Sequence, residues 1–190
     1  VALNVGDYYY SGGAWSSELD PSKTVVGVVC ARVNPTSSDP LLAKDFPDCE
    51  MFRRFSDMLD ERDIDVVDIA TCSVDHVDHA LKSLERGFWT LLESPLALTF
   101  DDAQVLRGAA QKAKSRLLVF HRGLFAPDFR LAKMAMTDAR LGDIYQVCVR
   151  REDFIRRDDW QTVKRLGGGA AYYAMPDLIL QTLRLLPLPV

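Results

Sequence analysis

The chain has 190 residues, of which 48% are hydrophobic and 26% charged, and its formal net charge at pH 7 is −4. This composition is typical of a soluble globular protein, and the acidic balance excludes a nucleic-acid-binding protein that acts through a large basic surface. No apolar run reaches the length of a membrane span, and no positively charged start precedes a short apolar region. We therefore expect no membrane partner and an intracellular, cytoplasmic location.

The cysteines and histidines follow no metal-binding or disulfide pattern. Four cysteines are scattered without Cys-x-x-Cys spacing: Cys30, Cys49, Cys72 and Cys148. His76 and His79 would share one helix face, but no third ligand is evident in the sequence. We predict free thiols in a reducing compartment and no metal site.

The start of the chain departs from the usual dinucleotide-binding pattern. Val1–Val5 predicts a first strand, and Gly6 stands at its end. A Gly-x-Gly-x-x-Gly turn would let the backbone approach a pyrophosphate there, but three tyrosines separate Gly6 from Gly12 and Gly13. We interpret the segment as a surface loop rather than an intact phosphate cradle.

A second apolar strand is predicted over Thr24–Ala31, and Arg32 follows it. Enzymes that prefer NAD place an acidic residue near this position, whereas an arginine suits the 2′-phosphate of NADP. An exposed arginine after a strand is also common, so Arg32 favours NADP only slightly. The next predicted elements are a helix over residues 35–46, a short strand over residues 50–52 and an amphipathic helix around Phe55.

The predicted fold is organised around one strand–helix–strand unit over residues 65–95. Val66–Ala70 is a short apolar run, typical of a strand buried on both faces. Ser73 is the predicted N-cap of a helix that Gly87 ends, and Phe88–Leu92 predicts the second strand. The two strands should be parallel, and ligands bind beyond the carboxyl ends of such strands.

Three further elements continue the alternation of strands and helices. Thr99 is the predicted N-cap of a helix whose first turn carries Asp101 and Asp102, which complement the helix dipole. Arg116–His121 predicts another strand, and Phe125–Ala139 predicts another helix.

The sequence pattern changes in the last third of the chain. Residues 144–150 alternate with period two, which predicts an antiparallel strand, and Gly167–Gly169 introduce a helix over residues 170–186. We interpret the arginine pairs between them as a solvated charged surface rather than an anion site. The predicted fold is α/β: a Rossmann-like doubly wound parallel sheet over residues 1–122, followed by the start of an α+β C-terminal domain over residues 123–190.

Five segments carry a family resemblance, at residues 65–76, 93–99, 125–129, 141–144 and 167–169. Through them the chain resembles the Gfo/Idh/MocA family of NAD(P)-dependent oxidoreductases of sugars, inositols and related polyols. The resemblance implies that the nicotinamide–ribose region and the cofactor pocket lie at the carboxyl ends of the central strands. The predicted cofactor-binding residues are Gly6, Arg32, Thr71, Ser73, His76, Glu93 and Pro95.

The residues that usually carry out catalysis in this family are replaced. Members of the family usually have the sequence Glu-Lys-Pro at this position, whereas this chain has the shorter, uncharged Ser94 in place of the lysine. The Asp and His that follow the triple glycine in the family correspond here to Tyr173 and Asp177. A tyrosine can donate a proton in hydride transfer, so we predict Ser94, Tyr173 and Asp177 as the catalytic positions. The alternative for Tyr173 is packing, together with Tyr172, at the domain junction.

Two functions remain open from the sequence. The first is an oxidoreductase-like protein that binds NAD or NADP, acts on a hydroxyl of a small sugar or polyol and forms a homo-oligomer through its C-terminal domain. The alternative is a catalytically inactive homologue that serves as a binding, regulatory or scaffold subunit. The combined loss of the lysine and of the Asp/His pair favours altered or abandoned chemistry.

Overall fold

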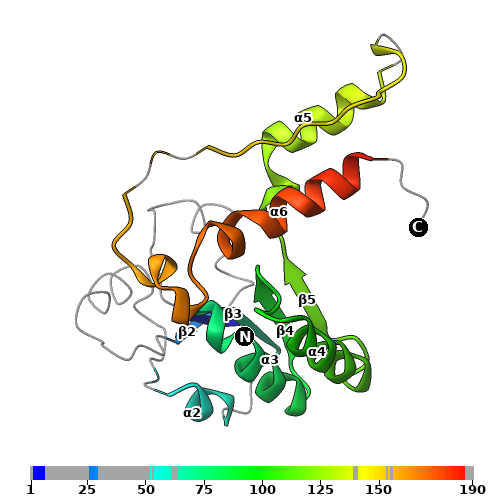
Figure 1. The fold of residues 1–190 in the computed structure, drawn as a ribbon. Coiled ribbons are helices and arrows are strands. Elements are labelled where there is room, and N and C mark those ends of the chain that lie inside the picture. The colour runs from blue at the N-terminus through cyan, green and yellow to red at the C-terminus, as the bar shows by residue number, and fades with distance from the viewer. Residues whose placement is uncertain are drawn as a thin grey trace. The chain divides into compact units, whose positions relative to one another are not determined.

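The computed structural model describes residues 2–6, 26–29, 52, 54–60, 64–138, 141–152, 154 and 156–186 (Figure 1). The chain forms two compact units, residues 1–119 and residues 120–190. The division falls near residue 122, and the cofactor and substrate roles given to the two predicted domains stay predictions. The predicted loop after Gly6, Arg32 and the predicted helix over residues 35–46 lie outside the described residues.

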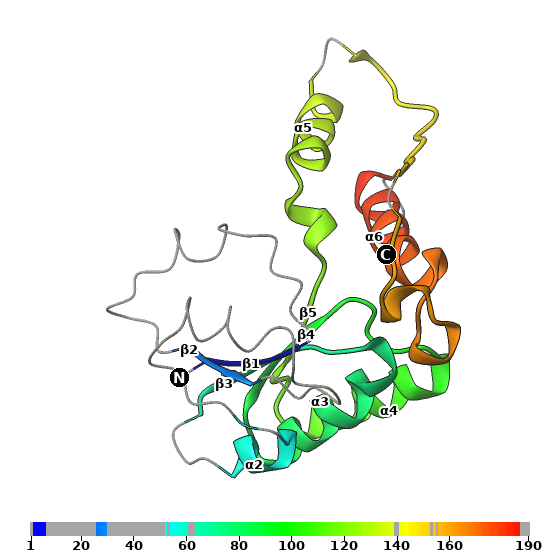
Figure 2. The same ribbon diagram turned by 90° about the vertical axis from the view of Figure 1, so that its left-hand side faces the viewer.

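The first unit is built on a five-stranded sheet with the order β2-β1-β3-β4-β5 (Figure 2). The strands are β1 (Ala2–Gly6), β2 (Val26–Val29), β3 (Val66–Ala70), β4 (Trp89–Glu93) and β5 (Leu117–Phe120). β1 pairs with β2 and β3, and β3 pairs with β4, in parallel throughout. This confirms the predicted parallel sheet. Since β2 and β3 lie on opposite sides of β1, the sheet is doubly wound, and the reversal at β1 marks where such folds bind ligands.

Three helices lie on one face of this sheet: α2 (Phe55–Leu59), α3 (His76–Glu85) and α4 (Phe100–Lys112) (Figure 2). α3 contacts β3, β4 and α4. Their apolar side chains form one core with the central strands, and its buried members are Phe55, Met58, Leu59, Ile64, Val67, Ile69, Ala80, Leu92 and Leu106. Each large apolar side chain in such a core stabilises the fold by about 1.5–3 kcal/mol relative to exposure.

Of the two predicted N-cap residues, Thr99 is confirmed and Ser73 is wrong. Thr99 caps α4, because its hydroxyl oxygen accepts a hydrogen bond from the backbone N–H of Asp102 at 3.1 Å. Ser73 does not cap α3. It begins a 3₁₀ turn, η1 (Ser73–Asp75), in which Asp75 N donates to Cys72 O at 2.8 Å. This turn takes up the first residues after β3, so α3 begins only at His76.

Beyond β5, the described residues of the second unit are helical or irregular. Its elements are η2 (Arg122–Phe125), α5 (Pro127–Met136), η4 (Trp160–Thr162), η5 (Lys164–Leu166) and α6 (Ala170–Leu185). α6 confirms the helix predicted after the triple glycine. α5 begins later than predicted, because η2 takes up Arg122–Phe125 and proline suits a first helical position.

The strand predicted over residues 144–150 is wrong. These residues are irregular and mostly exposed, and the side chain of Tyr145 is 96% exposed. A strand needs a neighbouring strand to pair its N–H and C=O groups, and the described part of the second unit beyond β5 contains none. Among the described helices, none combines the length and the apolar character that crossing a bilayer requires.

Replacing the core residue Leu106 with alanine should destabilise the first unit strongly. Leu106 is fully buried, so Leu106→Ala removes apolar contacts and leaves a cavity. We expect the free energy of unfolding to fall by about 2–5 kcal/mol in urea titrations followed by circular dichroism. The matched control is Val105→Ala on the same helix, where the side chain is 54% exposed. Equal effects of both variants would contradict the assignment of this core.

Candidate functional site

The predicted cofactor residues of the first unit gather at one edge of the sheet. Gly6 at the end of β1 is in register with Ala70 at the end of β3, so two small residues face each other where the winding reverses. Thr71 and Ser73 follow β3 and are buried, with exposed fractions of 6% and 3%. Parallel neighbouring strands bring their carboxyl ends to the same edge. Here Thr71 and Ser73, which follow β3, carry hydroxyl groups, and Gly6 at the end of the neighbouring strand has no side chain.

The ends of β3 and β4 are joined by the buried imidazole of His76. Its Nδ1 lies 2.8 Å from the carbonyl oxygen of Pro95, and its Nε2 lies 3.0 Å from the carbonyl oxygen of Thr71. Burial lowers the pKa of His76, whereas the two carbonyl oxygens and Asp75 act in the opposite direction. A carbonyl oxygen can only accept, and a neutral ring has one N–H. Only one of the two contacts is therefore a hydrogen bond while the ring is neutral.

The side chain of His79 contacts that of Thr71. Its Nδ1 lies 3.3 Å from Thr71 Oγ1, and its ring centroid lies 4.3 Å from that of Phe55. Burial lowers the pKa of His79, which favours the neutral ring. The described part of the chain contains no cluster of three His, Cys, Asp or Glu side chains that could hold a metal ion.

Glu93, Ser94 and Pro95 follow one another at the end of β4, with Glu93 and Ser94 half-buried and Pro95 buried. Ser94 therefore lies in the first unit, whereas the other predicted catalytic positions belong to α6 in the second. The assignment of these residues to cofactor and catalysis stays a prediction.

Asp177 on α6 is engaged by groups of the second unit. Its Oδ1 lies 3.2 Å from His121 Nδ1, and its Oδ2 accepts from the backbone N–H of Gly123 at 3.2 Å. Gln181, one turn further along α6, donates from Nε2 to the carbonyl oxygen of Gly123 at 2.6 Å. A Cβ on Gly123 would lie 2.9 Å from the Asp177 carboxyl carbon, so glycine permits this close approach. His121, which follows β5, is therefore a partner of Asp177.

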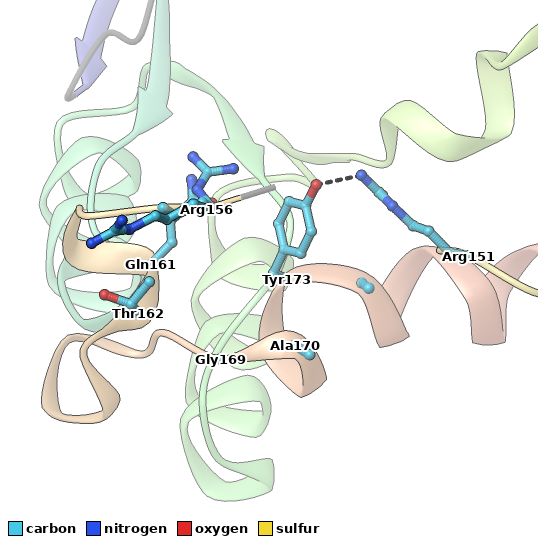
Figure 3. A pocket seen from close by; sticks show the side chains of 9 residues that line it. Arg151, Arg156, Gln161, Thr162, Gly169, Ala170 and Tyr173 are labelled. Atoms are coloured by element: carbon cyan, nitrogen blue, oxygen red, sulfur yellow. Dashed lines mark hydrogen bonds between the residues drawn. The ribbon is translucent and has the colours of Figure 1, made fainter. Parts of the chain in front are cut away.

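Tyr173 points into a pocket of about 610 Å³ in the second unit (Figure 3). We call it the arginine pocket, and its polar lining residues are Arg151, Arg156, Arg157, Gln161, Thr162 and Tyr173. Arg151 donates a hydrogen bond to the Tyr173 hydroxyl. The guanidinium carbons of Arg151 and Arg157 lie 4.6 and 5.7 Å from the centroid of the Tyr173 ring. The sequence interpretation of a solvated charged surface missed this pocket, because arginine and tyrosine meet from distant parts of the chain.

The triple glycine brings the pocket walls together. Gly167 has φ +78° and Gly169 has φ +119°, conformations that favour glycine. At Gly168 an added Cβ would lie 2.5 Å from the carbonyl oxygen of Gln161. That oxygen accepts from the backbone N–H of Gly169 at 2.8 Å. The glycines therefore place η4 against the start of α6.

Comparison with known proteins identifies the family. Residues 14–121 match the family model described as an oxidoreductase family with an NAD-binding Rossmann fold, GFO_IDH_MocA. The chain belongs to the Gfo/Idh/MocA oxidoreductase family. This confirms the resemblance seen in the sequence.

Relatives within the Gfo/Idh/MocA family share modest identity. scyllo-Inositol 2-dehydrogenase (NADP(+)) IolW of Bacillus subtilis is 27% identical over 156 residues, which are 81% of this chain and 44% of the relative. 1-Carboxy-3-chloro-3,4-dihydroxycyclohexa-1,5-diene dehydrogenase of Comamonas testosteroni is 28% identical over 149 residues, 74% of this chain and 37% of the relative. The chain therefore spans less than half the length of these curated relatives.

A solved NAD-binding protein from Listeria innocua has the same fold. It matches with a TM-score of 0.78 and 22% identity over 98% of this chain and 54% of its own.

The buried His76 should make stability depend on pH. Because burial lowers the pKa of the folded-state ring, the unfolded chain binds a proton more readily once the pH falls below about 6.5. The contribution of the neutral His76 ring to the free energy of unfolding is therefore fully present above that pH and is lost as the pH decreases. His79 acts in the same direction. We expect the free energy of unfolding in urea to decrease from about pH 8 to about pH 5.

The variant His76→Gln tests how much of the pH dependence of stability comes from His76. At about pH 8 it should be less stable than the parent by about 1–3 kcal/mol, because it disturbs a buried polar contact. The difference should narrow as the pH decreases, since the variant has no imidazole to protonate at this position. Parallel pH curves for parent and variant would contradict a role of His76 in the pH dependence.

Proposed function

We propose that this chain is part of an NAD(P)-dependent oxidoreductase that acts on a hydroxyl group of a sugar or polyol. The observation that carries the proposal is the pairing of Gly6 with Ala70 at the reversal point of a parallel sheet, beside the buried hydroxyl residues Thr71 and Ser73. Small residues let a pyrophosphate approach the backbone, and hydroxyl groups can bind ribose or nicotinamide oxygens. The described residues at this edge therefore fit a dinucleotide.

Gly6, Thr71, Ser73 and Glu93 would hold the cofactor in this proposal, and the bound nicotinamide would supply the hydride chemistry. His76 acts through the backbone, because its two ring nitrogens face the carbonyl oxygens of Thr71 and Pro95. We favour NADP over NAD, supported by Arg32 in the sequence and by the cofactor in the name of the Bacillus subtilis relative.

Tyr173 is the proposed proton-transfer residue. A guanidinium group has donors only, so the Tyr173 oxygen accepts in its bond with Arg151. We propose that the Tyr173 oxygen exchanges a proton with the substrate oxygen. Both oxygens of Asp177 are engaged by His121 and Gly123, so Asp177 positions neighbouring groups rather than reacting itself. Ser94 is an uncharged hydrogen-bonding group in place of the family lysine.

The substrate class is supported by relatives. One is named a dehydrogenase of scyllo-inositol and another a dehydrogenase of a dihydroxycyclohexadiene. We also propose a homo-oligomer formed through the second unit, where α5 and α6 expose large apolar side chains: Leu131, Met134, Ile179 and Leu183. We place the protein in the reducing cytoplasm, supported by the scattered spacing of the cysteines in the sequence.

A second candidate function is that of a non-catalytic binding or regulatory subunit. It is favoured by Ser94, which has no charge, and by Asp177, whose two oxygens are already engaged by protein groups. In this case the cofactor would be held without turnover.

Cofactor binding is tested by titrating the full chain with NADPH and with NADH while following tryptophan fluorescence. We expect saturable binding, tighter for NADPH. Thr71→Val should weaken it by about three- to tenfold, the effect of one hydrogen bond, whereas Thr137→Val at an exposed position should not. If neither NADPH nor NADH binds at millimolar concentration, the oxidoreductase proposal is excluded for both NADP and NAD.

Turnover separates the enzyme from the non-catalytic subunit. With NADP⁺ and a panel of polyols, Tyr173→Phe should reduce kcat by about 10²–10⁴-fold, because it removes the oxygen that would take up the proton of the substrate hydroxyl. Its matched control is Tyr172→Phe, the neighbouring position on α6, which should retain activity. Cofactor binding without turnover of any polyol would support the non-catalytic subunit instead.

A further inference from the structure

The arginine pocket is unusually rich in positive charge for an acidic protein. Three of its nine described lining residues are arginines, and none is acidic. Its volume of about 610 Å³ lies within the range of small-molecule sites, about 300–1,000 Å³. Charge of one sign in a concave site concentrates ligands of the opposite charge.

The carboxylates near the pocket compensate only part of this charge. Arg157 Nε lies 3.0 Å from Asp159 Oδ2, and the other oxygen of Asp159 accepts from the backbone N–H of Gln161 at 2.8 Å. Arg156 is exposed and forms no ion pair with a carboxylate in the part of the chain that the structure describes. A positive charge therefore remains in the pocket.

The tyrosine ring holds two of the guanidinium groups in place. Arg151 and Arg157 both lie within cation–π distance of the Tyr173 ring. Guanidinium groups can bind a carboxylate or a phosphate through two parallel hydrogen bonds. The ring thus orders two of the guanidinium groups that line the pocket.

One further feature of the pocket suits an anion. α6 begins beside the pocket at Gly169, with neither a side-chain cap nor an acidic residue in its first turn, so its positive end is uncompensated.

We propose that the arginine pocket binds the anionic group of the substrate, which is therefore a polyhydroxylated compound carrying a carboxylate or a phosphate. This inference rests on the proposed function, because it places the substrate beside Tyr173. Arg156 binds the anion beside Arg151 and Arg157, and Tyr173 lines the same pocket.

The test is calorimetric titration of the full chain with D-glucuronate, D-glucose 6-phosphate and D-glucose, with and without NADPH. We expect at least one anionic sugar to bind about tenfold or more tightly than glucose, and less tightly as salt is added. Preference for glucuronate assigns a carboxylate, and preference for glucose 6-phosphate assigns a phosphate. Equal or absent binding of all three sugars overturns the proposal.

Three arginine variants locate the effect. Arg156→Met removes the charge while keeping a long side chain, and it should weaken the anionic sugar about tenfold. Arg156→Lys should restore part of the affinity. The control is Arg165→Met, an exposed arginine of η5 that does not line the pocket. Equal losses in Arg156→Met and Arg165→Met would mean general surface attraction and would overturn the proposal.

The titrations also separate this inference from the proposed function. Binding of NADPH without selectivity for an anionic sugar overturns the inference and leaves the oxidoreductase proposal intact. Selective binding of an anionic sugar without any binding of NADPH supports the anion pocket and removes the oxidoreductase.

Discussion

The arrangement of the strand ends depends on one imidazole in the core of the first unit. His76 spans the carbonyl oxygens of Thr71 and Pro95, the residues that follow β3 and β4. These strands also carry the hydroxyl residues and Glu93 that we assign to the cofactor. The spacing between the two strand ends is therefore set by a polar contact inside an apolar core, where any change in the charge of the ring has a high energetic cost. His76 therefore affects both the arrangement of the proposed cofactor site and the stability of the first unit.

Most of the first unit could be predicted from the sequence, because its signals are local. Val66, Val67, Ile69 and Ala70 form an apolar run that only Asp68 interrupts, and the strand has the bounds Val66–Ala70. Thr99 stands before two acidic residues, and it caps α4 as expected. The prediction that Ser73 is an N-cap was wrong, since a serine before an apolar helix pattern suits both a cap and a 3₁₀ turn. The choice between them depends on how the chain leaves β3, which local sequence does not specify.

The arginine pocket could not be predicted, because it depends on contacts between distant segments. Arg151 and Tyr173 are separated by 22 positions and meet only when α6 has been placed. Alternating arginine and acidic residues also describe an ordinary solvated surface, so the sequence gives no reason to prefer an anion site. The strand predicted over residues 144–150 was wrong for a related reason: alternation indicates a strand only where a neighbouring strand is present to pair with it.

The departure from the family pattern at position 173 makes the arginine pocket of the second unit more positively charged. An aspartate at position 173 would place a carboxylate among three arginines and neutralise part of their charge, whereas the tyrosine found there is neutral and stacks with two of them. Asp177 supplies a carboxylate one turn later, but His121 and Gly123 engage it, and it is not among the described residues that line the pocket. In our proposal an anionic ligand balances the positive charge that remains in the pocket. On this view the replacements suit a change of substrate charge as well as a loss of the usual acid and base.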